Sequence, residues 1–468
     1  MQTKSLTWAA SLGVAAALGL SAVACTPAAP GSTPPQEALY TPVGLALSAN
    51  GERLYVVNAN FNQRFRNGWI SSLDVTRLLH LAQGQGDPED VFAQRLLIPS
   101  LGGSMTLDAS GQVGLVACRG SGTAVLLETT ADGTLSCGDA GAPGAQEGLS
   151  SSEQETDCDR GHLLRIDAGE LTEGLAADYV RDPFATLLFD YQPVAGDSRT
   201  IASIGQLRST WMGFYAVQGE PGARTLTFEH SVQLDRALLG GVGQIAARPG
   251  ERGRYLAAVN RRYGATSVTG TLYMLDYDHI VADEPNGVRY RRLQPEFGTD
   301  QVGGLAFSAD GERTYVSAQS PDGVVELDSQ VRPALVTDDA GDTTLLEAPQ
   351  YDLAGAVPLL GSPNGILYVE RQTGTPIVVA AALRKDALYI LRPDGATLEL
   401  VGEVADVGQG PFAMVYLPFE GRDWLLVTTF YDHGVAVVDI SGDEPRNFAR
   451  RYHLRSKEKE YDAIDRPH

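Results

Sequence analysis

The sequence lacks the short motifs that mark common catalytic and cofactor sites. It contains no Cys-x-x-Cys-His segment for covalent haem, no His-Glu-x-x-His zinc motif, no Gly-x-Ser-x-Gly elbow and no phosphate-binding P-loop. The seven histidines are scattered along 468 residues. Only His433 falls on a loop near the predicted channel mouth described below, and we expect it to be a surface side chain. We therefore expect no cofactor and no metal site.

Basic residues are scarce relative to acidic ones. The chain has 36 Lys and Arg against 58 Asp and Glu, a formal net charge of −22. Nucleic acids and anionic membrane surfaces are bound through basic surfaces. This composition therefore argues against a nucleic-acid partner and against broad contact with a membrane. The hydrophobic share of 43% is that of a globular chain.

Long apolar runs are absent after the N-terminus. Lys4 is the only charge in residues 1–24, an apolar run follows from Leu6 to Leu20, and the segment ends in Ser-Ala-Val-Ala. A basic start, a short apolar core and a small-residue exit predict a secretory signal peptide over 1–24. No later segment has 18 uninterrupted apolar residues, so we expect no further membrane span.

Cys25 follows this segment directly and resembles the acylated cysteine of the bacterial lipoprotein lipobox. Ala22 stands where the usual pattern has Leu. The Pro-rich stretch over 25–38 suits a stiff tether. The resemblance implies a protein of the bacterial cell envelope, on the outer membrane or the periplasmic side, that touches the membrane only through its lipid. The alternative is ordinary cleavage after Ala24, which would give a secreted protein.

Cysteine is also rare, with four in the chain. Cys137 and Cys158 bracket a polar, Gly- and Ser-rich stretch, and an oxidising compartment favours a disulfide between them. Cys118 lies on an apolar predicted strand, where we expect a buried thiol. The competing pairing joins Cys118 to Cys137.

The chain repeats one passage. "GLALSANGERLYV" starts at Gly44 and "GLAFSADGERTYV" at Gly304, with ten of 13 positions identical. The Asn-Gly or Asp-Gly pair predicts a tight hairpin with positive φ. The alternating, β-branched segments before and after it predict strands. With two further strand patterns downstream, the unit is a four-stranded antiparallel sheet.

Seven such units follow one another, with starts near 44, 103, 184, 242, 304, 364 and 411. Their third strands end in a recurring acid: Asp74, Glu128, Asp276, Asp328 and Asp439. We predict an all-β fold, a seven-bladed β-propeller of four-stranded antiparallel blades over 39–456. A disulfide-closed insertion at 137–158, a charged tail at 457–468 and no helix of useful length complete the prediction. Segment 447–455 would supply the last blade with its own outer strand.

The segments "LYVVNAN" and "GVAVVDI" resemble the YVTN-repeat family of seven-bladed propellers in secreted and surface-attached prokaryotic proteins. The close match covers two blades, and the other five match in pattern. The resemblance implies the fold and an extracytoplasmic setting. It implies no single activity, because propellers host lactonases, quinoprotein dehydrogenases and binding modules.

Arginine recurs on one set of loops. In a propeller, the loops after the second strands and those before the first strands share a face, here called the top face. Five of the seven second-strand loops carry arginine: Arg64, Arg66, Arg119, Arg208, Arg261, Arg262 and Arg384. The guanidinium fork suits carboxylates and phosphates. The loops before the first strands are Gly-rich and also carry Asp182, Asp235 and Asp300, which could instead neutralise the arginines.

These features favour a lipid-anchored binding module, expected to be monomeric. The expected partner is another envelope protein, a glycan or an anionic small molecule. The alternatives are a propeller enzyme of lactonase-like or quinoprotein-dehydrogenase-like type, and a purely structural scaffold. A cluster of carboxylates with a histidine would favour an enzyme, and an apolar patch on the top face would favour a protein partner.

Overall fold

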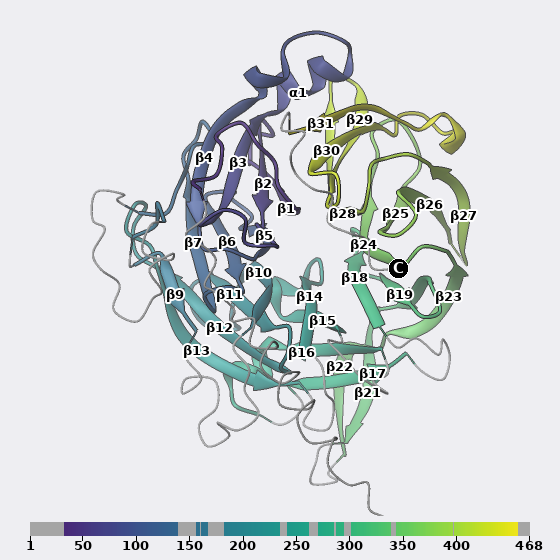
Figure 1. Ribbon diagram of the computed structural model, residues 1–468. Helices are drawn as coiled ribbons and strands as arrows, with labels where there is room; N and C mark the ends of the chain where they lie inside the picture. The colour runs from purple at the N-terminus through teal and green to yellow at the C-terminus, as the bar shows by residue number, and fades with distance from the viewer. Residues whose placement is uncertain are drawn as a thin grey trace, which may run out of the picture.

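The computed structural model describes residues 32–138, 156–159, 161–166, 182–234, 241–261, 270–284, 287–293, 301–337, 343–395 and 397–456. The expected signal peptide, Cys25, the first part of the tether and the charged tail lie outside the described residues. Within them the chain forms seven antiparallel blades around one axis (Figure 1). The predicted seven-bladed β-propeller is confirmed.

Each blade runs from an inner strand at the axis to an outer strand at the rim (Figure 1). Blade 1 comprises β1 (Pro42–Leu47), β2 (Arg53–Asn58), β3 (Gly68–Asp74) and β4 (Phe92–Ile98). Blade 2 comprises β5 (Gly102–Leu107), β6 (Val113–Cys118), β7 (Thr123–Thr129), β8 (Leu135–Ser136) and β9 (Leu163–Arg165). Blade 3 comprises β10 (Pro183–Tyr191), β11 (Arg199–Gln206), β12 (Trp211–Gln218) and β13 (Thr225–Gln233).

The second half repeats this order. Blade 4 comprises β14 (Gly241–Ala247), β15 (Tyr255–Arg261), β16 (Thr271–Asp276) and β17 (Val288–Arg292). Blade 5 comprises β18 (Gln301–Phe307), β19 (Arg313–Gln319), β20 (Gly323–Asp328) and β23 (Asp352–Pro358). Blade 6 comprises β24 (Pro363–Val369), β25 (Ile377–Ala382), β26 (Ala387–Asp394) and β27 (Thr397–Val404). Blade 7 comprises β28 (Pro411–Phe419), β29 (Arg422–Thr429), β30 (Gly434–Asp439) and β31 (Ala449–Arg455).

Each of the seven interfaces between neighbouring blades has its own buried apolar cluster. The cluster that closes the ring packs Leu45, Leu54 and Val56 of blade 1 against Leu417 and Leu426 of blade 7. The outer strand β31 pairs with β30 of its own blade. The ring is therefore closed by apolar packing between complete blades, without an exchanged strand, because burying apolar area needs no shared hydrogen bonds.

The repeated hairpin turns are built alike. In blades 1 and 5, the glycines at 51 and 311 have φ of 69° and 71° and donate their N–H to the carbonyls of Ser48 and Ser308. Only these glycines adopt positive φ in the turns; Asn50 and Asp310 instead accept hydrogen bonds from nearby backbone or side chains. The Asn-Gly and Asp-Gly pairs thus predict the positions of the turns correctly. Each turn has one residue with positive φ, whereas a type I′ hairpin turn has two.

The recurring acids at the ends of the third strands serve the opposite, bottom face of the ring. Asp74 pairs with Arg53 at 3.1 Å, and Asp276 pairs with Arg254 at 2.8 Å. In both cases the arginine lies at or just before the start of the adjacent second strand. These pairs join neighbouring strands of one blade, so the repeated acid is explained by blade structure.

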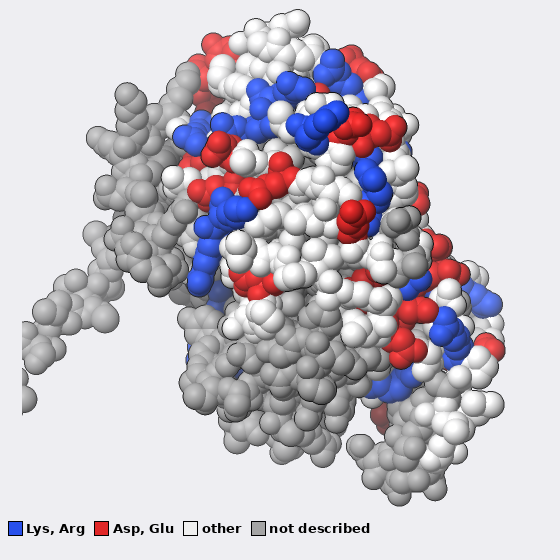
Figure 2. Space-filling view, turned by 90° about the vertical axis from the view of Figure 1, so that its right-hand side faces the viewer, with Lys and Arg blue, Asp and Glu red and all other residues white. Residues whose placement is uncertain are grey.

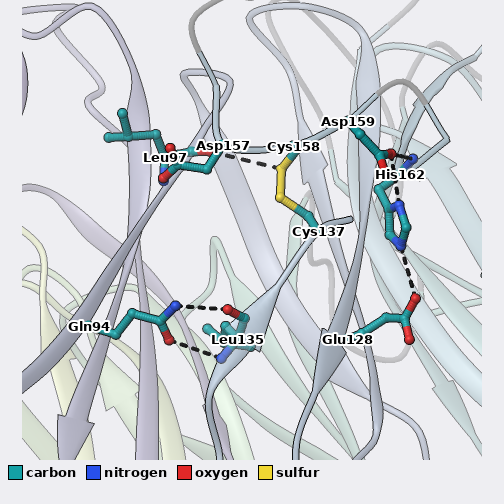
Figure 3. Close-up of a disulfide and its surroundings, with 9 residues drawn as sticks. All are labelled: Gln94, Leu97, Glu128, Leu135, Cys137, Asp157, Cys158, Asp159 and His162. Carbon is teal, nitrogen blue, oxygen red and sulfur yellow. Dashed lines mark hydrogen bonds and ion pairs between the residues drawn. A yellow bond between two sulfur atoms is a disulfide. The ribbon is translucent and has the colours of Figure 1, made fainter. Parts of the chain in front are cut away.

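The outer edge of blade 2 carries the expected disulfide. Cys137 and Cys158 are bonded and buried, so the alternative pairing with Cys118 is wrong, and Cys118 is a buried thiol outside the disulfide. Next to the disulfide, Asp157 accepts the N–H of Leu97 on β4 at 2.7 Å (Figure 3). The segment around the disulfide therefore ties blade 2 to blade 1.

Among the described residues, two short α-helices occupy connections between strands, where no helix was expected. Helix α1 (Val75–Ala82) joins β3 to β4 and buries Val75, Leu78 and Leu79 at helical spacing, and Asp74 caps it by accepting the N–H of Arg77. Helix α3 (Tyr277–Val281) occupies the equivalent connection in blade 4. Short 3₁₀ turns span Pro88–Val91, Glu251–Gly253 and Pro445–Asn447. Among the described residues, no helix has the length and apolar character needed to cross a membrane.

A separate hairpin of β21 (Val331–Thr337) and β22 (Thr343–Pro349) is inserted in blade 5 between β20 and β23. Leu335 and Leu345 face each other across it and are 74% and 64% exposed. On the side of the molecule shown in Figure 2, basic and acidic side chains are interleaved. Blades 6 and 7 contain such pairs, for example Lys385 with Glu403 and Arg422 with Asp439.

Candidate functional site

The top face contains a cavity of about 250 Å³. One position of the repeat builds much of its wall, namely the first residue after the second strand. In blades 1, 2, 3, 6 and 7 this residue is Ala59, Arg119, Leu207, Leu383 and Phe430, and all five line the cavity. The remaining wall comes mainly from the starts of the inner strands. The same position of the repeat in five blades therefore contributes a side chain to one cavity.

Aromatic rings dominate the lining. Phe430 of blade 7 lies 5.8 Å from Phe61 and 6.3 Å from Phe412, measured between ring centroids, and 5.1 Å from Tyr431. Phe184 of blade 3 also lines the cavity. Phe61 is 51% exposed, so the aromatic cluster is open to solvent on this side. The aromatic wall is therefore an open apolar surface at the mouth of the ring.

Among the lining residues that the structure describes, Arg119 is the single charged side chain. Its Nε donates to Oδ1 of Asp182 at 2.6 Å and its Nη2 donates to Oδ2 at 3.1 Å. The guanidinium also lies 5.9 Å from the centroid of the Phe184 ring, within cation–π range. Asp182 is 6% exposed and anchored through its backbone, since its N–H donates to Gln206 and its carbonyl accepts from Leu207. Arg119 is thus held in a fixed orientation at the wall.

Backbone hydrogen bonds link the loops around the mouth into a chain. The N–H of Ala59 donates to the carbonyl of Thr41, the N–H of Leu101 to Ala59, and the N–H of Arg119 to Leu101. Buried Asn60 braces the following loop by bonding both backbone groups of Phe65. The aromatic wall therefore stands on a rigid base, which lowers the entropy cost of binding.

Several acids near this face are engaged with backbone amides. Asp386 accepts the N–H of Gly410, Asp432 accepts the N–H of Gln409, and Asp322 accepts the N–H of Ser362. These carboxylates fix the loops before the inner strands.

Below the cavity lies a channel space of about 220 Å³ along the axis, lined by the seven inner strands. Val43, Phe184 and Phe412 line both spaces, so the cavity leads into the channel. Glycines on the inner strands let the blades approach closely. A Cβ on Gly365 would lie 2.3 Å from the carbonyl oxygen of Phe412 in the next blade. Gly365 therefore serves the packing of blade 6 against blade 7.

His433 corrects one expectation, because it is 5% exposed and not a surface residue. Its Nδ1 accepts the N–H of Thr41 at 3.1 Å, and its ring lies 4.5 Å from the ring of Tyr40, measured between centroids. Burial lowers the pKa of His433 to about 4. A neutral imidazole therefore holds the chain entering blade 1 against blade 7.

The predicted arginines do not converge as a group. Arg119 lines the cavity, while Arg64, Arg208 and Arg384 are exposed and Arg66 is half-buried. Arg208 and Arg384 directly follow the lining residues Leu207 and Leu383, so they belong to the rim of the same face. Arg261 ends β15 but its side chain lies outside the described residues, as do Arg262, Asp235 and Asp300.

Two groupings of carboxylates around a histidine occur among the described residues, and neither lines the cavity. His279 contacts Asp276 at 2.9 Å and Glu284 at 3.5 Å, beside the bottom-face pair of Asp276 with Arg254. The second lies at the outer edge of blade 2 (Figure 3). His162 is 2% exposed and contacts Glu128 at 3.0 Å and Asp159 at 2.9 Å. Burial alone would raise the pKa of Glu128, but hydrogen bonds from Gly222, His162 and Arg224 outweigh it and lower the pKa. This cluster lines no part of the top-face cavity and holds the disulfide segment to β7. Within the described ranges, no group of His, Cys, Asp or Glu is arranged to hold a metal.

The sequence reasoning missed the aromatic wall, although a signal exists. "PFA" occurs at Pro183-Phe184-Ala185 and again at Pro411-Phe412-Ala413, each time at the start of an inner strand. "NF" and "TF" place Phe61 and Phe430 just after second strands. An alignment of the blades at the ends of their second strands and the starts of their inner strands would have shown that these aromatic residues share the top face.

Comparison with known proteins gives the fold alone. No family model and no curated protein matches the chain. Among solved structures, the Cps50 (Swd1) β-propeller domain of Myceliophteria thermophila is 12% identical, with a TM-score of 0.51. Kuenenia stuttgartiensis hydrazine synthase is also 12% identical, with a TM-score of 0.50. Each comparison covers 86% of this chain and 97% of the other. A putative 6-phosphogluconolactonase from Bacteroides uniformis is 14% identical with a TM-score of 0.47, over 81% of this chain and 87% of that one. These likenesses concern the fold and carry no function over to this chain.

Proposed function

We propose that this propeller is a binding module of the bacterial cell envelope whose top-face cavity takes an anionic partner that carries an apolar group. The aromatic wall supports the apolar part of the proposal, because an open apolar surface on a rigid base is suited to binding. Arg119 and the rim arginines Arg64, Arg208 and Arg384 support the anionic part. The partner would be a small molecule, a glycan or a segment of another envelope protein.

The observation that carries the proposal is the cavity itself, where five blades converge on aromatic rings and one oriented guanidinium. The lactonase-like and quinoprotein-like alternatives need an acid–base, metal or cofactor constellation at this mouth. The described lining residues offer Arg119, the phenol of Tyr431 and otherwise apolar groups. Binding is therefore the function that the lining chemistry supports best.

Fluorescent dyes test the cavity directly. Anilinonaphthalene sulfonate is an anionic aromatic probe and N-phenylnaphthylamine is a neutral one of similar shape. We expect the protein to bind the anionic dye in a single saturable site and Phe430→Ala to weaken binding about tenfold. Leu335→Ala, on the exposed hairpin and outside the cavity lining, is the matched control and should leave binding unchanged. Dye binding that is insensitive to Phe430→Ala would contradict the proposal.

The location outside the cytoplasm is part of the same proposal and rests on the N-terminal pattern ending at Cys25. Cells fed an alkyne-tagged fatty acid should label the wild-type protein, and Cys25→Ser should abolish both the label and membrane association. A Cys25→Ser protein that stays membrane-bound and labelled would contradict lipid anchoring. A wild-type protein released without label would support ordinary cleavage instead.

A further inference from the structure

Building on the proposed function, we infer that the ligand of the top-face cavity is a monocarboxylate with one apolar group beside the carboxylate. The apolar group lies on the aromatic wall of Phe61, Phe412 and Phe430, and the carboxylate binds the guanidinium of Arg119. A free small acid and the C-terminal end of a peptide share this chemistry.

The first step is the hydrogen-bonding capacity of Arg119. A guanidinium has five N–H donors. Asp182 takes one from Nε and one from Nη2, and within the described part of the chain no partner of Nη1 is found. Three donors therefore remain, and two of them lie on the edge formed by Nη1 and Nη2. This edge has the fork geometry that binds a second carboxylate through two parallel hydrogen bonds.

The second step is orientation. Because Asp182 is buried and fixed by its own backbone bonds, it aligns the guanidinium before any ligand arrives. The backbone N–H of Arg119 is also bonded, to Leu101, whose own N–H bonds to Ala59. A preorganised donor binds with less loss of side-chain entropy than a mobile surface arginine does. Asp182 is thus a positioning residue for Arg119.

The third step is charge. Asp182 already compensates the charge of Arg119, so the pair alone offers hydrogen bonds with little excess positive charge. A singly charged carboxylate can use those donors, with Arg208 and Arg384 on the exposed rim supplying the balancing field. A phosphate monoester would bring a second negative charge next to Asp182, which is unfavourable. The geometry therefore favours monocarboxylates over phosphates.

The fourth step is size. Pockets that hold drug-sized ligands are about 300–1,000 Å³, whereas this cavity is about 250 Å³. Because the cavity opens into the channel of about 220 Å³ below it, it has room for at least one ring or one branched aliphatic group. Aromatic pairing with Phe430 or Phe412 would add to the burial of apolar area.

Calorimetric titration of the full chain carrying Cys25→Ser tests the inference with matched probes. Phenylpropanoate and phenylpropanamide have the same shape and differ in charge, and phenethyl phosphate carries two charges. We expect phenylpropanoate to bind at least tenfold more tightly than the other two, in keeping with charge-assisted hydrogen bonds. A tripeptide ending in Phe, with a free or an amidated C-terminus, separates the two sources of the carboxylate.

Variants locate the effect. Arg119→Gln alone would leave Asp182 buried without its partner, so Arg119→Gln combined with Asp182→Asn is the informative variant. It should bind phenylpropanoate no better than phenylpropanamide, while Phe430→Ala should weaken both probes. Equal affinity of the acid and the amide for the wild type would overturn the inference and leave the proposed function standing. Absence of binding by both probes and by the dyes would overturn the proposed function as well.

Discussion

Acid should loosen the ring at its closing interface, because His433 is buried there as a neutral imidazole. The pKa of His433 is lowered to about 4 by burial, while an unfolded histidine has a pKa of about 6.5. Between these values the unfolded chain binds the proton and the folded chain does not, so stability falls as the pH falls. The contribution is fully present above about pH 6.5 and is lost progressively toward pH 4.

The magnitude follows from the same shift. Lowering the pH from about 7 to about 5 should remove about 2 kcal/mol of unfolding free energy through His433 alone. Protonation would also turn the acceptor Nδ1 into a donor facing the N–H of Thr41, which breaks that hydrogen bond. Burial lowers the pKa of nearby His453 as well, which adds to the effect in the same direction.

His433→Asn isolates this term. Asparagine does not titrate, can accept the N–H of Thr41 and tolerates the positive φ of 55° at this position. Urea unfolding at about pH 7 and pH 5 should show that the variant loses about 2 kcal/mol less than the wild type on acidification. His80→Gln, at the half-buried end of α1, is the control and should keep the full loss. A wild-type-like loss in His433→Asn, or a His433 resonance that titrates near pH 6.5 in NMR, would refute the reasoning.

Two further predictions concern stability. Replacing Cys137 and Cys158 by serine should lower the unfolding free energy by about 3 kcal/mol in the chain-entropy model, because the disulfide closes a loop with a sequence separation of 21; an unchanged urea midpoint would contradict its role at the edge of blade 2. Gly365→Ala should destabilise the protein by about 1–3 kcal/mol through overpacking, because the new Cβ would meet the Phe412 carbonyl of the next blade. Gly355→Ala is the matched control, since its Cβ would find its nearest atom at 3.4 Å; similar melting temperatures for the two variants would count against the close approach of the inner strands.

The fold was predictable because several independent sequence features repeat once in each blade. The Gly-containing turns, the alternating strands and the recurring acids such as Asp74 all recur with the blade, and each has a local structural cause. Helix α1 was missed because it is one short connection of eight residues between strands. Its apolar spacing at Val75, Leu78 and Leu79 is a helical signal that a strand-dominated pattern concealed.

For the candidate site, the sequence allowed a prediction of the face of the propeller but not of the residues that line the cavity. The arginine pattern pointed to loops that line the top-face cavity, but sequence alone does not tell which loop residue faces the axis. In blades 3 and 6 the lining residue is the leucine before the arginine, whereas in blade 2 it is Arg119 itself. A shift of one residue around the end of a strand exchanges a wall position for a rim position. The burial of His433 likewise depends on the closure of blade 1 against blade 7, which no local pattern encodes.

A crystal structure with iodophenylpropanoate tests the central claim most directly, because the anomalous signal of iodine locates the ring without bias. The account predicts an iodine peak against Phe430 and Phe412 in the top-face cavity, with the carboxylate on the free edge of Arg119. An iodine peak anywhere else on the propeller, with the cavity unoccupied at saturating ligand, would contradict it.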